Sequence, residues 1–181
     1  MSAGRGAHQR PGVGAPLPSA LARIVSREGA AADAAAWRVA GERVVLANGV
    51  FDLLHVGHVR YLQQARALGT RLIVAVNDDA SVAGKKGPGR PVLLARDRAS
   101  LVASLRGVDR VVLFDDPTVD ALLRELKPHV HAKGTDYRTD TVPERATAAE
   151  VGAETAITGD AKQHASRELV ERVRALHAGD A

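Results

Sequence analysis

Short runs of apolar residues alternate along the chain with stretches in which apolar positions recur every three or four residues. The runs are typical of buried strands and lie at 44–47, 71–77, 110–114, 129–132 and 153–157. The helically spaced stretches lie at 61–68, 96–105, 118–126, 143–151 and 166–176. This alternation predicts an α/β fold, a single domain with a Rossmann-like parallel sheet of about five strands and helices on both faces.

The chain is expected to divide into three segments. The first, 1–18, is rich in glycine, proline, alanine and arginine, which is typical of a flexible tail. The second, 19–42, is expected to be a helical segment, with Ser26 as the N-cap and an end near Gly41. The functional domain is then expected over 43–177.

The segment 78–94 differs from its neighbours because glycine, proline, lysine and arginine crowd its middle, 84–91. Such a composition disfavours a regular buried element. We therefore expect a mobile, positively charged loop beside the strand at 71–77.

Composition narrows the classes of function. Lysine and arginine number 25 against 21 acidic residues, an excess that suits an anionic small molecule better than nucleic acid. Cysteine is absent, in agreement with a reducing compartment, and we expect a cytoplasmic protein. No apolar run approaches the roughly 20 residues of a membrane span, so no membrane partner is expected.

The strongest chemical signal is the string NGVFDLLHVGH at 48–58, between the first predicted strand and the first predicted helix of a strand–helix–strand unit. In open α/β sheets, ligands bind at this carboxyl edge. Gly49 allows a sharp turn, and Gly57 leaves room for a phosphate at the helix N-terminus. An HxGH string alone is short, and its histidines could be structural, but the strand before it and the helix after it favour a functional site.

These residues resemble those of the cytidylyltransferase-like nucleotidyltransferases, whose signature combines a G-x-F-D segment with HxGH. The resemblance runs from about Arg43 to Leu176. Within that family the chain looks most like the nucleotidyltransferase domain of heptose-phosphate adenylyltransferases, because it also carries VAVNDDAS at 74–81, RPV at 90–92 and KGTDY at 133–137.

The resemblance implies that a phosphate oxygen of the acceptor attacks the α-phosphorus of ATP and releases pyrophosphate. The nucleophile is already anionic, so positioning and charge neutralisation would carry catalysis. By the same resemblance His55, His58 and Lys85 would be the catalytic residues. A solvated surface lysine is the alternative reading of Lys85.

The resemblance also implies two sets of binding residues. Asp52 and Asn77 would contact the acceptor, although Asp52 could instead stabilise the turn, and for Arg98 an exposed helix charge remains an alternative. The family's final Ser-Thr-Thr-like run is replaced here by His164-Ala165-Ser166-Arg167. The residues expected to bind the nucleotide are Asn48, Gly49, Val50, Phe51, Gly57, Lys86, Arg98, Lys133, Gly134, Asp136, Ser166 and Arg167.

The expected cofactor is Mg²⁺ bound with ATP, without a metal site built by the protein. His129 and His131 are more readily explained as structural residues. The expected partners are ATP and a sugar phosphate, D-glycero-β-D-manno-heptose 1-phosphate by resemblance, supplied by a separate heptose kinase. Relatives of this kind also imply a homodimer.

Two alternatives stay open. A cytidylyltransferase acting on glycerol 3-phosphate or another polyol phosphate would share the same phosphate-binding residues. A nucleotide-binding module without turnover is the second, because the final motif is altered. A tRNA-charging enzyme with HxGH is excluded, since the sequence has neither an anticodon-reading domain nor a Lys-Met-Ser-Lys-Ser-like loop.

Overall fold

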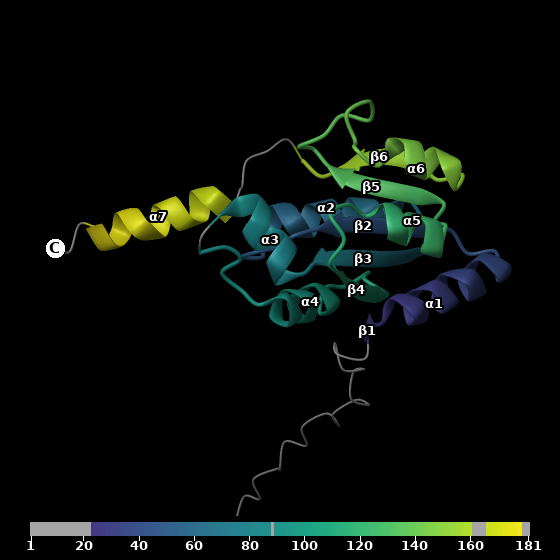
Figure 1. Cartoon of the computed structure of the whole chain (residues 1–181), viewed down its shortest axis with the longest axis horizontal. Helices are drawn as coiled ribbons and strands as arrows, with labels where there is room; N and C mark the ends of the chain where they lie inside the picture. The colour runs from purple at the N-terminus through teal and green to yellow at the C-terminus, as the bar shows by residue number, and fades with distance from the viewer. Residues whose placement is uncertain (1–22, 88, 161–165, 179–181) are drawn as a thin grey trace, which may run out of the picture.

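Six parallel strands form one sheet in the computed structural model, which describes residues 23–87, 89–160 and 166–178 (Figure 1). Their order across the sheet is β1-β4-β3-β2-β5-β6, and every neighbouring pair is parallel. The predicted α/β class and Rossmann-like parallel sheet are confirmed. The strands are β1 (Ile24–Val25), β2 (Val44–Gly49), β3 (Arg71–Asn77), β4 (Arg110–Phe114), β5 (Val130–Gly134) and β6 (Glu154–Thr158).

The sequence predicted about five strands, and the sixth is β1 at the edge beside β4. It has only two residues, too few for an apolar run to indicate a strand. The seven helices of the described ranges are α1 (Arg27–Val39), α2 (Val56–Ala67), α3 (Asp79–Lys86), α4 (Ala95–Ala103), α5 (Asp120–Leu126), α6 (Arg145–Glu150) and α7 (Ser166–Ala178).

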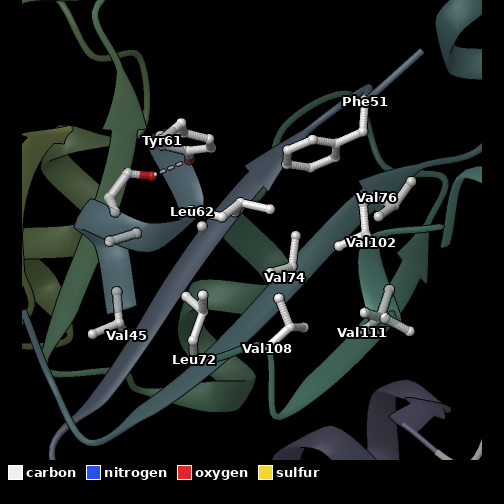
Figure 2. Packing of buried hydrophobic residues seen from close by; sticks show 14 of the residues in the cluster. Val45, Phe51, Tyr61, Leu62, Leu72, Val74, Val76, Val102, Val108 and Val111 are labelled. Atoms are coloured by element: carbon white, nitrogen blue, oxygen red, sulfur yellow. Dashed lines mark hydrogen bonds between the residues drawn. The ribbon is translucent and has the colours of Figure 1, made fainter. Parts of the chain in front are cut away.

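Two apolar cores lie on opposite faces of the sheet, which explains why the central strands are continuous apolar runs. On one face, Val45 of β2 and Val74 of β3 pack with Leu62 of α2 and Val102 of α4 (Figure 2). On the other face, neighbouring strand residues pack with α1, α5 and α6. Helices therefore cover both faces, as predicted.

The sheet reverses its strand order at β2, which pairs with β3 on one side and with β5 on the other. The chain passes from β2 through β3 to β4 and then crosses back to β5. A crevice outside the carboxyl ends of the strands is expected at such a switch point. The string at 48–58 begins there.

The predicted loop over 78–94 is wrong in its first half, because α3 occupies Asp79–Lys86. The side chain of Asp78 accepts a hydrogen bond from the Ser81 amide and caps the helix. The helix ends at Gly87, whose φ of 83° suits glycine. The charged and glycine-containing sequence concealed a helix that starts with a strong N-cap.

Two glycines offer a paired test of this packing. A Cβ at Gly69 would lie 2.4 Å from the backbone oxygen of Arg43, whereas one at Gly84 in α3 would meet nothing within 4 Å. Gly69→Ala should lower the free energy of unfolding by about 2 kcal/mol, because a backbone atom must move. Gly84→Ala should raise it by up to about 1 kcal/mol, because glycine is unfavourable in a helix.

The measurement is urea unfolding followed by circular dichroism. Equal midpoints for Gly69→Ala and the parent protein would contradict the described packing of the turn between α2 and β3.

Candidate active site

A cavity of about 360 Å³ opens at the carboxyl ends of the central strands. It is bounded by the segment after β2, by the end of α3 and by the segments after β4 and β5. Its lining residues are Asn48, Gly49, Val50, Phe51, Asp52, His58, Tyr61, Asn77, Lys85, Lys86, Phe114, Pro117, Thr118, Val119, Lys133, Gly134, Asp136, Tyr137 and Glu144.

The segment after β2 has an unusual backbone, with positive φ at Phe51 (53°) and Leu53 (51°). Such angles are costly for residues other than glycine, so surrounding contacts must maintain them. The Phe51 ring is buried in the core under α2 and α4, and the guanidinium of Arg98 donates to the Val50 carbonyl over 2.5 Å.

The two motif histidines lie at the start of α2, where His55 is the N-cap. Their rings stack with centroids 3.9 Å apart, and the edge of the Phe51 ring lies against His58. The backbone amide of His55 donates to Nδ1 of His58 over 3.4 Å. This bond occupies Nδ1 and assigns the proton of the neutral ring to Nε2.

The pKa of His58 is lowered from 6.5 to about 4, first by burial and then by the charges of His55 and Lys86. His58 is therefore neutral at physiological pH. A neutral ring with a protonated Nε2 can donate a hydrogen bond to a phosphate oxygen. This role fits the ring better than proton transfer does. Because the first amides of a helix have no partners inside it, the start of α2 adds further donors.

Two lysines at the end of α3 provide positive charge at the cavity. Lys85 is exposed, and its Nζ donates to the Pro117 carbonyl over 2.7 Å. The pKa of Lys86 is lowered, first by burial and then by the nearby charge of Arg90. Lys86 also lines the cavity, so its ammonium is available to an anionic ligand.

Asp52 holds the chain that follows α3. Its carboxylate is 1% exposed and accepts hydrogen bonds from Arg90 and from the amides of Val92 and Leu93. Burial tends to raise the pKa of Asp52, but the Val92 amide and Arg90 outweigh it and hold the pKa below its usual range. Asp52 therefore lines the cavity and stabilises the turn at the same time.

Arg98 is 0% exposed and does not line the cavity. Besides Val50, it donates to the Leu93 carbonyl over 3.0 Å and forms an ion pair with Asp79 at 2.8 Å. It thus joins the segment after β2, the segment before α4 and the start of α3. The alternative that Arg98 is an exposed charge on a helix is therefore excluded. Its contacts are those of a residue that positions neighbouring segments.

A polar group at the ends of β2 and β5 completes the site. The Oδ1 of Asn48 lies 3.1 Å from Nε2 of His131 and accepts from Lys133 Nζ over 3.3 Å. Lys133 forms a buried ion pair with Glu144 at 3.0 Å. His129 accepts from the Val44 amide over 3.0 Å, and the structural roles expected for His129 and His131 remain predictions.

The structure brings most of the predicted site residues to the cavity, but not all. His55 reaches it only through its contact with His58, and Gly57 belongs to the first turn of α2. Ser166 and Arg167 begin α7, and their side chains lie outside the described part of the chain. The expected binding roles of all these residues remain predictions.

Sequence reasoning missed several lining residues. Tyr61 was assigned only to a helix, yet its hydroxyl donates to the Ala132 carbonyl over 2.8 Å and links α2 to β5. Glu144 was assigned only to the region of a helix, with no signal in the sequence for its inward direction. The other missed residues are Phe114, Pro117, Thr118, Val119 and Tyr137.

Within 23–87, 89–160 and 166–178, no three His, Cys, Asp or Glu side chains lie close enough to hold a metal ion. In the same ranges, every helix is too short or too polar to cross a membrane.

Comparison with known proteins identifies the relatives of this chain. Residues 46–172 match the family model described as cytidylyltransferase-like. The "Bifunctional protein HldE" of Magnetococcus marinus is 53% identical over 108 residues, 60% of this chain and 22% of that protein. The protein of the same name from Pseudomonas syringae pv. syringae is 47% identical over 133 residues, 74% of this chain and 28% of that protein. The chain thus spans about a quarter of the length of these relatives.

A solved structure shares the fold. The lipopolysaccharide core biosynthesis protein from Thermoplasma volcanium GSS1 superimposes with a TM-score of 0.58 at 26% identity, covering 67% of this chain and 100% of that chain. The chain belongs to the cytidylyltransferase-like family, and the resemblance seen in its sequence is confirmed.

The buried histidines predict an acid-sensitive fold. The pKa of His131 is lowered to about 4, first by burial and then by Lys133, and that of His58 is also about 4. Between about pH 6.5 and 4 the unfolded chain takes up protons that the folded protein excludes. The free energy of unfolding should therefore decrease as the pH is lowered from about 6.5 to 4, by up to about 1.4 kcal/mol per pH unit for each histidine.

The measurement is urea unfolding of the parent protein and His131→Asn at several pH values. The variant should show the shallower dependence between about pH 6.5 and 4, and equal slopes would contradict a neutral buried His131.

Proposed function

We propose that the protein transfers AMP from ATP to a sugar phosphate, D-glycero-β-D-manno-heptose 1-phosphate, giving ADP-heptose and pyrophosphate. Three findings support this assignment: the string at 48–58, the similarity to proteins named HldE, and the fold shared with a lipopolysaccharide core biosynthesis protein. The observation that carries it is the neutral His58 at the start of α2, which lines the same cavity as Lys86 at the end of α3.

The proposed reaction forms a bond between an acceptor phosphate oxygen and the α-phosphorus of ATP. The bond from that phosphorus to the bridging oxygen of pyrophosphate breaks, and its electron pair leaves with pyrophosphate. His58 donates from Nε2 to a phosphate oxygen, and the start of α2 supplies backbone amides. Lys86 and Lys85 offset the charge of the triphosphate and of the leaving group.

Within 23–87, 89–160 and 166–178 no three candidate ligands lie together at a metal-binding distance, and Asp52 is engaged by Arg90 and two amides. We propose that Mg²⁺ is bound by the triphosphate of ATP.

The proposed acceptor requires a kinase that phosphorylates the heptose first, and we propose that this is a separate protein. A homodimer and a cytoplasmic location, where ATP is abundant, belong to the same proposal.

The first test of this function measures pyrophosphate release with Mg²⁺, crossing ATP, CTP, GTP and UTP with heptose 1-phosphate and glycerol 3-phosphate. Release should be fastest with ATP and heptose 1-phosphate. Release with CTP and glycerol 3-phosphate would replace the proposal with a cytidylyltransferase, and no release with any pair would contradict catalysis on these substrates.

The second test concerns His58. His58→Ala should lower kcat by about 100-fold or more, because a preorganised donor to a phosphate oxygen is lost. His58→Gln should retain more activity, since its amide can still donate. Both variants should unfold near the parent temperature, and near-normal kcat in His58→Ala would contradict the assigned role.

A further inference from the structure

The ion pair between Lys133 and Glu144 lies in the cavity at the end of β5. Each residue is 5% exposed, and both line the cavity. The Nζ of Lys133 lies 3.0 Å from Oε2 and 3.3 Å from Oε1 of Glu144. Buried ion pairs are weak contributors to stability, because desolvation offsets their attraction. Stability alone therefore does not explain why this pair borders a ligand cavity.

The position of Lys133 is fixed by several contacts at once. Its ammonium also donates to Asn48 Oδ1 over 3.3 Å and lies 5.0 Å from the centroid of the Tyr137 ring. Glu144 neutralises its charge at close range. A neutralised ammonium attracts a phosphate less than a free one does, so this wall of the cavity is poorly suited to a triphosphate.

Glu144 keeps an unused acceptor. Its Oε2 is buried, yet within the described part of the chain no donor meets it with hydrogen-bond geometry, although Lys133 Nζ lies nearby. A buried acceptor without a hydrogen bond costs free energy that a bound donor can recover. A carboxylate next to an ammonium fits a hydroxyl group, which donates to one and accepts from the other.

The cavity is therefore asymmetric in charge. Lys85, Lys86 and the neutral His58 lie on the side of α2 and α3, where phosphate binding is expected. The neutralised pair of Lys133 and Glu144 lies on the side of β5 and α6. A phosphorylated polyol is a ligand with matching ends, one anionic and one rich in hydroxyls.

We propose that the Lys133–Glu144 pair is the subsite that recognises the hydroxyl groups of the acceptor, with Glu144 as the residue that determines specificity for a sugar. This inference rests on the proposed function for the identity of the acceptor. It assigns a role in binding to Glu144 and moves Lys133 from the nucleotide, expected from the sequence, to the sugar.

The test measures acceptor binding without ATP, by NMR titration of the full chain with heptose 1-phosphate and with methyl phosphate. The ratio of the two dissociation constants reports recognition of the hydroxyls. Glu144→Gln should raise the dissociation constant for heptose 1-phosphate by about 10-fold or more, because the charged hydrogen-bond acceptor is lost. Methyl phosphate should bind at least as well as before.

The matched control is Glu150→Gln at the end of α6, the helix that Glu144 precedes as N-cap. The Glu150 carboxylate pairs with Arg124 at the surface and lies outside the cavity. The control variant should leave both dissociation constants unchanged. The inference is overturned if Glu144→Gln raises the dissociation constants of both ligands by the same factor, or changes neither. If Glu144→Gln does not fold, the test is the binding of deoxy analogues of the sugar phosphate to the parent protein. Loss of one hydroxyl should weaken binding by about 10-fold, and equal affinity for every analogue overturns the inference.

These outcomes separate the inference from the proposed function. A parent protein that binds heptose 1-phosphate through Glu144 but releases no pyrophosphate with it supports the subsite and refutes the reaction. A parent protein that releases pyrophosphate only with acceptors lacking a sugar, and binds no sugar phosphate, overturns the inference and leaves nucleotidyl transfer intact.

Discussion

The guanidinium of Arg98 holds the segment after β2 in a backbone conformation that would not persist alone. It is fully buried and bonds to the carbonyls of Val50 and Leu93 and to Asp79. Phe51 packs into the core from the same segment. The start of α2, where His58 meets the cavity, and α3, which carries Lys85 and Lys86, are thereby fixed relative to each other. Catalysis by positioning requires this kind of fixed geometry.

Charge in the cavity follows from burial as much as from residue type. His58 is kept neutral, so it offers a donor without adding a positive charge beside the two lysines. Lys133 also carries an amino group at the cavity, but Glu144 forms an ion pair with it at 3.0 Å. Two lysines at opposite walls therefore differ in what they can bind, because only one is held by a buried carboxylate.

Local patterns in the sequence predicted the elements that depend mainly on neighbouring residues in the chain. The apolar runs located five strands, and the spacing of Gly49, Phe51 and the two histidines located the site. The patterns failed where a contact distant in sequence decides the outcome. The sequence around Arg98 does not distinguish it from an exposed helix arginine, because its contacts with Val50 and Asp79 are distant in sequence. Glu144 precedes α6, and its position depends on the packing of α6 against α5 and β6. The helix at α3 was hidden by its lysines and Gly84, although Asp78 was available as a cap.

In the proposed reaction the cavity directs attack to the α-phosphorus of ATP. The most direct measurement incubates the protein with heptose 1-phosphate and ATP labelled with ³²P at either the α or the γ position, and separates the products. With attack at the α-phosphorus, the α label should appear in the nucleotide sugar and the γ label in pyrophosphate. Transfer of the γ label to the sugar, with formation of ADP, would contradict it and indicate a kinase.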